Sequence, residues 1–306
     1  MQRYLKRRLL TLIPVVFGVV TAVFLIIHLI PGDPVVLMLG ENAQPGDIEA
    51  LRSQLGLDKP LWLQYVHFWE GLVRGHLGDS IYHRQPVLGL ILERLPNTMI
   101  LAVCALLVSL SIAFPLGILA ALHQRKIVDY ISLGFSILGV SMPVFWLGPL
   151  LILIFAVQLH WLPVAGMGSW RHLILPSITM GLGLSAITTR MIRSSMIEVM
   201  NQDYIRTAFA KGLNKRVVVW KHAFKNVLIP VITIVGLQLG ALFGGAIITE
   251  VVFSYPGVGR LLILAILRRD YPVVQGTILV IAILYIGVNL VVDLVYSWAD
   301  PRIRLG

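Results

Sequence analysis

Six long apolar stretches constrain this chain more than any other feature. A helix that crosses a lipid bilayer needs about 20 mostly apolar residues. Hydrophobic residues make up 57% of the 306 residues and charged ones only 13%, so a soluble core could not hide this apolar surface. The sequence therefore predicts an all-α integral membrane protein with about six transmembrane helices. The expected spans are Leu9–Ile30, Asn97–Leu122, Tyr130–Gln158, His172–Ile192, Leu228–Val252 and Thr277–Trp298.

The basic residues predict the orientation of these spans. The formal net charge of +10 is compatible with nucleic acid or with a membrane surface. An even number of spans leaves both termini on one side of the membrane. That side holds sixteen Lys and Arg residues, against four in the short loops of the other side. Because short loops rich in Lys and Arg stay in the cytoplasm, both termini are expected there, and a nucleic-acid surface is excluded.

The expected organisation has three parts. Residues 1–30 hold the cytoplasmic N-terminus and a first helix whose apolar stretch is too long for a signal peptide, so we expect it to be retained. Residues 31–96 form a long outer segment. Residues 97–306 form a core of five transmembrane helices, which includes a cytoplasmic loop over residues 193–227.

The outer segment contains one predicted amphipathic helix, from Pro60 to Gly71. Its apolar residues recur at the helical spacing that places them on one face, and Trp62 is typical of a membrane–water boundary. The helix either lies on the bundle or in the lipid headgroups, or it forms a lid or docking surface for something delivered from outside. The expected apolar face consists of Leu61, Tyr65, Phe68, Trp69 and Leu72.

The cytoplasmic loop is too long for a simple connection between two spans. Ser194 or Ser195 can cap a first short helix that Gly212 ends, and Asn214 can cap a second that ends before Pro230. The loop therefore predicts two short helices around a break.

Two properties of this loop bear on its role. In the second helix one face is apolar and the other basic, as in helices that lie at a membrane surface. Small residues around the break would let another backbone approach closely. We therefore predict a docking element, with a basic loop against anionic lipid as the alternative. The apolar face holds Val217, Trp220 and Phe224, the basic face Lys221 and Lys225, and the break Ala208, Ala210 and Gly212.

Three polar residues lie in or near the last two spans: Glu250, Asn289 and Asp293. Polar groups at membrane depth are costly and often functional, so these residues either line a translocation pathway or form interhelical hydrogen bonds. The single cysteine, Cys104, can form no intramolecular disulfide, and no cluster of residues has metal-site spacing. We therefore expect no metal site.

The sequence has no catalytic motif and no phosphate-binding loop for ATP, since Gly-Lys does not occur. We therefore expect no catalytic residues. If the chain moves a solute uphill, the energy must come from an ion gradient or from another chain. An ion-driven secondary transporter is the alternative function; it would favour inverted internal repeats and a polar midplane site, and no clear repeat is present.

Eleven segments taken together resemble one known family, the B-type permease subunits of bacterial ABC importers for dipeptides, oligopeptides, glutathione and nickel. The resemblance covers essentially the whole chain, in order. The segments are Ile30–Pro34, Leu55–Pro60, Leu77–Ser80, Asp203–Leu213, His222–Asn226, Ile229–Pro230, Gly244–Glu250, Tyr255–Arg260, Arg269–Gln275, Asn289–Asp293 and Asp300–Arg304.

The resemblance implies a type I ABC importer permease bundle with no cofactor of its own. A homologous second permease, two ATP-binding subunits that hold ATP and Mg, and a periplasmic or lipid-anchored substrate-binding protein would be its partners in the bacterial inner membrane. It would move solute by alternating access; peptide is the first choice, then glutathione or a nickel chelate. This sequence differs from the family's Glu-Ala-Ala-x-x-x-Gly coupling motif at the first two positions, where it has Arg206 and Thr207. The implied ATPase-coupling residues are Arg206, Thr207, Ala208, Ala210, Lys211, Gly212 and Leu213.

Overall fold

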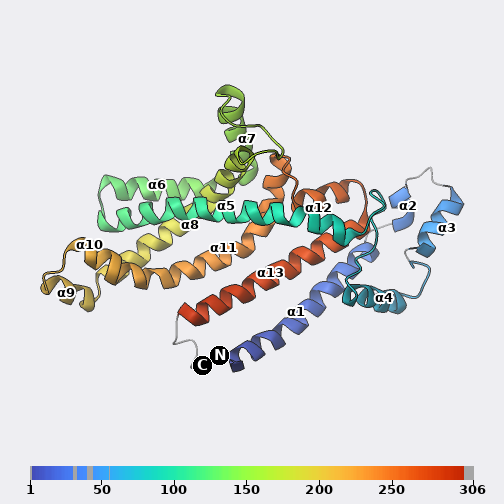
Figure 1. Ribbon diagram of the computed structural model, residues 1–306, viewed down its shortest axis with the longest axis horizontal. Helices are drawn as coiled ribbons and strands as arrows, with labels where there is room; N and C mark the ends of the chain where they lie inside the picture. Colours follow the sequence, from blue (N-terminus) through green and yellow to red (C-terminus); the bar gives the residue numbers. More distant parts are fainter. Residues whose placement is uncertain (1, 30–32, 40–43, 55, 300–306) are drawn as a thin grey trace. The chain divides into compact units, whose positions relative to one another are not determined.

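The computed structural model describes residues 2–29, 33–39, 44–54 and 56–299. The first and last segments of the family resemblance, Ile30–Pro34 and Asp300–Arg304, lie partly or wholly outside these ranges. The chain divides into two compact units, and each is considered by itself (Figure 1). Unit 1 comprises Thr98–Tyr255 and the residues from Gly287 onward, and unit 2 comprises Gln2–Asn97 and Pro256–Ile286.

The described residues are mostly helical, with one isolated β-bridge between Asp79 and Pro86. The π-helical segments η1 and η2 continue α7 and α10 without a break. In chain order the elements are α1 (Gln2–Leu29), α2 (Pro34–Leu39), α3 (Pro45–Gln54), α4 (Leu61–Val73), α5 (Val87–Leu122), α6 (Ile127–Ser141), α7 (Val144–Leu151), η1 (Ile152–Gln158), α8 (Arg171–Met200), α9 (Asp203–Ala210), α10 (Lys215–Val217), η2 (Val218–Ala223), α11 (Phe224–Val252), α12 (Val258–Leu267) and α13 (Tyr271–Ala299).

The membrane character predicted from the sequence is confirmed. Four helical stretches among the described residues are long and apolar enough to cross a membrane. The bent pair α6 and α7–η1 passes the same test when its halves are taken together, and α1 contributes a shorter apolar stretch, Leu10–Leu25. The four stretches are Val87–Leu122, Arg171–Met200, Lys215–Gly240 and Tyr271–Val292.

The third predicted span is broken. The predicted span over Tyr130–Gln158 is not one straight helix, because the chain bends by 105° between α6 and α7. Met142 has extended backbone angles (φ −84°, ψ 115°) and Pro143 follows it. Proline has no amide hydrogen to donate and disfavours helical geometry in the residue before it. Figure 1 shows α7 turning away from the direction of α6.

Unit 1 is organised around α8, which packs against α6 and α11. Close approach depends on small residues. A β-carbon at Gly181 would lie 2.7 Å from a methyl of Val108 and 2.8 Å from the carbonyl oxygen of Ala105, both on α5. At Gly183, by contrast, an added β-carbon would meet open space.

In unit 2, α4 packs on α1 with the face that the sequence predicts. Phe68, Trp69 and Leu72 contact the cluster of Val20, Val23 and Leu279. The Tyr65 hydroxyl lies 2.7 Å from the Thr21 hydroxyl. Leu61 is the exception, since its side chain remains 60% exposed. This helix is therefore an integral part of unit 2.

Candidate functional site

The predicted docking element begins later than the sequence suggests. Helix α8 continues to Met200, so Ser194 and Ser195 lie inside it and cap nothing. The chain breaks at Gln202, whose backbone is extended (φ −75°, ψ 149°), and α9 then starts at Asp203. The expected cap is overridden because Ser195 is buried in the bundle, where packing continues the helix.

The turn after α9 has the geometry that its residues predict. Gly212 has a positive φ of 80°, a conformation that favours glycine. The amide of Leu213 donates to the Ala208 carbonyl (3.3 Å), and that of Gly212 donates to the Phe209 carbonyl (2.9 Å), the usual hydrogen bonds of a glycine-ended helix. Asn214 caps the next helix, because its side-chain oxygen accepts from the amide of Arg216 at 3.1 Å.

The helix after this turn does not end before Pro230, contrary to the sequence expectation. α10, η2 and α11 form one continuous helix, and Pro230 lies inside α11. Proline inside a membrane helix is tolerated where neighbouring groups satisfy the freed backbone carbonyl. The docking element is therefore continuous with a transmembrane helix.

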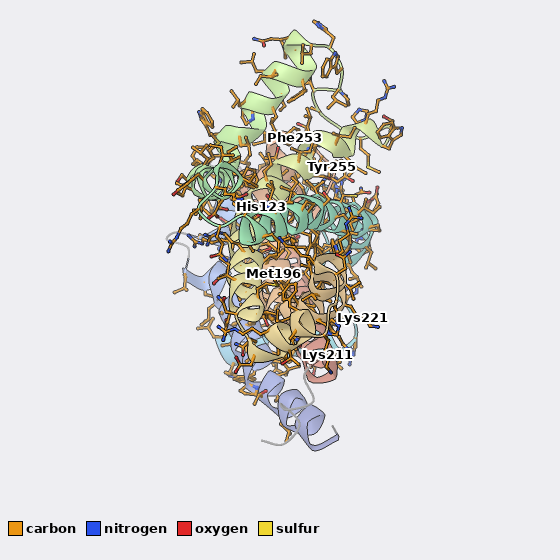
Figure 2. The ribbon with its side chains drawn as sticks, turned by 90° about the vertical axis from the view of Figure 1, so that its left-hand side faces the viewer. His123, Met196, Lys211, Lys221, Phe253 and Tyr255 are labelled. Carbon is orange, nitrogen blue, oxygen red and sulfur yellow. The ribbon has the colours of Figure 1, made fainter. Side chains whose placement is uncertain are left out.

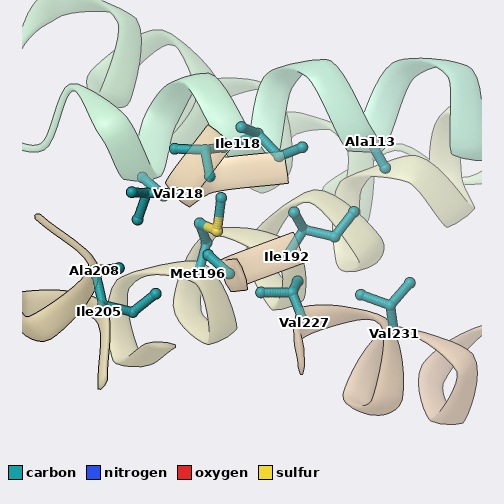
Figure 3. Packing of buried hydrophobic residues seen from close by; sticks show 12 residues of the cluster. Ala113, Ile118, Ile192, Met196, Ile205, Ala208, Val218, Val227 and Val231 are labelled. Atoms are coloured by element: carbon teal, nitrogen blue, oxygen red, sulfur yellow. The ribbon is translucent and has the colours of Figure 1, made fainter. Parts of the chain in front are cut away.

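One face of α9 is buried in the core of unit 1. Ile205 is fully buried, Ala208 is only 7% exposed, and both join a cluster with Met196 of α8 and Val218 and Ala223 of η2. Figure 3 shows Met196 between these elements. Ala208 therefore faces inward, which corrects the expectation that its small side chain lies at an exposed turn. Its size serves packing within the chain.

Five apolar side chains of the loop are exposed, and we call this set the docking face. They come from α9, the turn and α10–η2, and each is more than a third exposed. On α9, Tyr204 and Phe209 flank the buried face, whereas the side opposite that face carries Arg206, Thr207 and Ala210. Exposed large apolar side chains gathered in one loop are typical of a site of interaction with a protein or membrane. The docking face consists of Tyr204 (43% exposed), Phe209 (40%), Leu213 (37%), Val217 (41%) and Trp220 (59%).

Charged residues of the same loop are also exposed, and most are basic. Arg206 is well exposed and lies 3.6 Å from the carboxylate of Asp203, one turn earlier. Figure 2 is turned so that this end of unit 1 faces the viewer, with Lys211 and Lys221 labelled. Thr207 and Ala210 are also exposed. The rim suits a partner surface with acidic groups.

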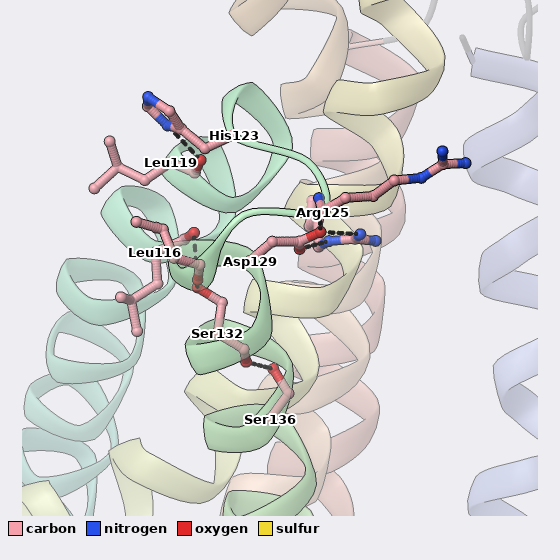
Figure 4. Close-up of polar contacts among 9 residues, drawn as sticks. Leu116, Leu119, His123, Arg125, Asp129, Ser132 and Ser136 are labelled. Atoms are coloured by element: carbon pink, nitrogen blue, oxygen red, sulfur yellow. Dashed lines mark hydrogen bonds and ion pairs between the residues drawn. The ribbon is translucent and has the colours of Figure 1, made fainter.

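A partly buried ion pair holds α8 close to the end nearest this loop. The Arg193 guanidinium donates two hydrogen bonds to Asp129 at the start of α6, at 2.5 and 2.9 Å. The amide of Arg125 donates to the same carboxylate at 2.9 Å, as Figure 4 shows. Sequence reasoning missed this pair, because the partners are 64 positions apart. The acidic residue in the first turn of α6 was the only local signal.

The three predicted polar residues have different surroundings. Glu250 is fully buried and accepts a hydrogen bond from the Thr98 hydroxyl at 2.6 Å. Burial, followed by the charges of Glu250 and Cys104, raises the pKa of nearby Tyr255 to about 12. Asn289 is half-buried on α13, and the side chain of Asp293 lies outside the described residues. Glu250 thus has the interhelical hydrogen bond that was one of its two expected roles.

No group of three or more metal-ligating side chains occurs in the part of the chain that the structure describes. The strongest assembly of features is therefore the docking face with its buried anchor.

Known proteins match this sequence over nearly its whole length. The family model described as "Binding-protein-dependent transport system inner membrane component" matches residues 113–305, and a related N-terminal model matches residues 1–102. A dipeptide transport system permease protein, DppB, of Alkalihalophilus pseudofirmus is 45% identical, over 99% of this chain and 100% of the relative. A glutathione transport system permease protein, GsiC, of Escherichia coli O6:H1 is 44% identical, over 99% of each chain.

Solved structures share the fold. A chain of the inward-facing MetNI methionine ABC transporter has a TM-score of 0.58 and 17% identity, and the match covers 69% of this chain and 96% of that one. A chain of an amino acid ABC transporter has a TM-score of 0.55 and 13% identity, covering 68% and 94%. At this identity the likeness supports the architecture alone.

Proposed function

The chain belongs to the family of binding-protein-dependent transport system inner membrane components, the permease subunits of ABC importers, and from this premise we propose that it forms half of the solute pathway of an importer for peptides or a related small solute. In this family a separate subunit hydrolyses ATP, so the chain is a permease and not an enzyme. An ion-driven secondary transporter is not favoured.

The orientation follows from the basic loops. We place both termini and the docking face in the cytoplasm, and the segment 31–96 and α12 on the outer side of a bacterial inner membrane. The docking face then lies where an ATPase would bind. The asymmetry of sixteen against four basic residues supports this placement.

The observation that carries the mechanism is the two-sided character of α9. Its inner face is anchored in a core shared with α5, α8 and η2, while its exposed side carries Arg206, Thr207 and Ala210, flanked by Tyr204 and Phe209 of the docking face. A subunit that pulls on the outer face would move the helices packed on the inner one. Since α10–η2 continues into α11, this motion would reach the transmembrane bundle and reorient it, as alternating access requires.

The proposed complex has four further components. A homologous permease completes the pathway, two ATP-binding subunits with ATP and Mg bind below, and a periplasmic or lipid-anchored binding protein delivers the solute. Within that complex the coupling residues would be Arg206, Thr207, Ala208, Ala210, Lys211, Gly212 and Leu213, with Ala208 acting through core packing. The pathway role of Glu250, Asn289 and Asp293 stays a proposal.

The substrate is proposed from the relatives. One is named for dipeptides and another for glutathione, at 45% and 44% identity. Both solutes are small peptides with free carboxylates, which is the class we propose, and a nickel chelate is the next choice. Competition of dipeptides, tripeptides and glutathione for uptake would rank them, and we expect a dipeptide or glutathione to compete best.

Purification of the tagged permease from native membranes in mild detergent tests the function. We expect a second permease and an ATPase with a phosphate loop to stay bound, and the eluate to hydrolyse ATP. Recovery of this chain alone, under conditions that preserve a related peptide importer, would contradict the proposal.

A further inference from the structure

A basic pocket lies in unit 2, outside the features already assigned. Its volume is about 240 Å³, and three arginines line it: Arg94 near the start of α5, Arg260 on α12 and Arg268 at the end of α12. Tyr82 and Asp270 also contribute to its wall. We call it the arginine pocket. The function of a permease core in transport does not by itself require such a cluster.

The wall of the arginine pocket is held in place by one carboxylate. Asp270 is 2% exposed and accepts a hydrogen bond from the Ser80 hydroxyl at 2.5 Å. It also accepts from the amides of Ile81 (3.3 Å) and Tyr82 (3.2 Å). These bonds join the segment before α5 to the start of α13. The Asp270 carboxylate is therefore engaged within the protein, although its charge lowers the net positive charge of the pocket.

The same contacts position an arginine. The Asp270 carboxylate holds the backbone of Tyr82, and the guanidinium carbon of Arg268 lies 3.9 Å from the centroid of the Tyr82 ring. A guanidinium over an aromatic ring still has N–H donors with which to bind an acceptor. The Tyr82 ring thus gives Arg268 a partner in the wall of the pocket.

The remaining charges in the wall also favour an anion. Arg94 donates to the Leu90 carbonyl at 3.0 Å and lies 3.9 Å from the carboxylate of Glu93, which leaves further donors of its five N–H groups. The pocket also borders Gly257, the residue before the ten-residue helix α12, and helix N-termini favour negative charge. The lining thus includes three arginines and one carboxylate, that of Asp270.

The volume of the pocket limits the size of the ligand that it can hold. Sites for small molecules usually measure about 300–1,000 Å³, so 240 Å³ suits one side chain better than a whole peptide. Arginine binds carboxylates through paired hydrogen bonds. We propose that the arginine pocket receives an Asp or Glu side chain of the substrate-binding protein and fixes its position on the outer face. This inference rests on the proposed function, which places α12 outside.

Binding of the importer's own substrate-binding protein to the complete complex in nanodiscs tests the pocket. Arg268→Gln should weaken this binding by about tenfold, since charge-assisted hydrogen bonds to a carboxylate would be lost, and should make the affinity less dependent on salt. Arg74→Gln is the matched control, because Arg74 is exposed after α4 in the same unit and does not line the pocket. Arg268→Lys should recover only part of the affinity.

Elution volume and ATPase activity without binding protein show whether each variant assembles. Should Arg268→Gln fail to assemble, Arg260→Gln provides the second test. In a second series, each surface Asp or Glu of the binding protein is changed to Lys. One of these variants should lose affinity for the wild-type complex but lose little more for the Arg268→Gln complex, because the two residues form one contact.

Equal affinities for the wild type, Arg268→Gln and Arg74→Gln would overturn the pocket while leaving the importer function intact. A raised KM for a free-acid peptide but not for its C-terminal amide, with unchanged affinity for the binding protein, would assign the pocket to the solute and also overturn the proposal. A complex that recruits no binding protein and takes up no solute would refute the proposed function itself.

Discussion

The docking face of unit 1 and the arginine pocket of unit 2 are built on opposite principles. The docking face is apolar and exposed, and its helix is anchored by buried hydrophobic residues. The arginine pocket is charged and recessed, and its wall is anchored by hydrogen bonds to one carboxylate. A surface that transmits force needs an anchor that resists displacement, whereas a surface that recognises a partner needs oriented charges. The comparison suggests that charge inside unit 1 serves structure and that charge in the pocket serves recognition.

The largest effect should come from breaking the charge pair of unit 1. Asp129→Ala leaves Arg193 without its buried partner. Removal of one member of a fully buried pair costs about 3 to 5 kcal/mol, and the 23% exposure of the Arg193 side chain brings the expected loss toward the lower figure. We expect little assembled complex, measured by fluorescence-detected size exclusion after heating. Ser136→Ala, on the same helix, is the control and should lower the temperature at which half of the complex is lost by less than Asp129→Ala does. An Asp129→Ala complex as stable as the control would show that this charge is not structural.

The next effect should come from the apolar anchor of α9. Ile205→Ala removes a fully buried side chain, and such changes cost about 2 to 5 kcal/mol. We expect a lower unfolding midpoint together with lost uptake. The control is Thr207→Ala on the exposed side of the same helix. If both variants unfold alike, α9 is not anchored through its inner face.

Local signals predicted one part of this site and tertiary contacts decided the rest. Gly212 and Asn214 were found because a glycine end and an Asn cap act within a few residues. The burial of Ala208 depends on Met196 and Val218, which periodicity within one short helix cannot reveal. The Asp129–Arg193 pair likewise joins distant positions.

Prolines show the same limit in the fold. The apolar run over Tyr130–Gln158 concealed the bend at Pro143, whereas Pro230, expected to stop a helix, lies inside α11. Whether a proline breaks a membrane helix depends on what its neighbours offer the freed carbonyl. The six apolar stretches, in contrast, predicted the membrane fold directly because lipid requires them.

A smaller effect is expected at the turn of the docking element. Gly212→Ala puts a β-carbon on a residue with a φ of 80°, at a cost of about 1 kcal/mol. Uptake should fall while the complex stays assembled, and ATP hydrolysis should respond less to the binding protein. Gly183→Ala, at a helical glycine with open space around its β-carbon, is the control. Normal stimulation in Gly212→Ala would argue against a rigid turn.

The smallest effect is expected at Glu250. Glu250→Gln retains an acceptor for the Thr98 hydroxyl, so a structural role predicts uptake within about twofold of the wild type, since a neutral hydrogen bond contributes about 1 kcal/mol or less. The measurement compares initial rates of dipeptide uptake into vesicles that contain Glu250→Gln or the wild type. A tenfold loss in Glu250→Gln with unchanged assembly would instead place this carboxylate in the pathway.

Site-specific cross-linking tests the central claim most directly, namely that the outer side of α9 contacts the ATPase. In a Cys104→Ser background, a single cysteine replaces exposed Ala210 or buried Ala208, and a short photoreactive maleimide reports the neighbouring subunit. We predict an adduct with the ATPase from Ala210→Cys and none from Ala208→Cys. Equal adducts from both positions, or none from Ala210→Cys in a complex that hydrolyses ATP, would contradict the account.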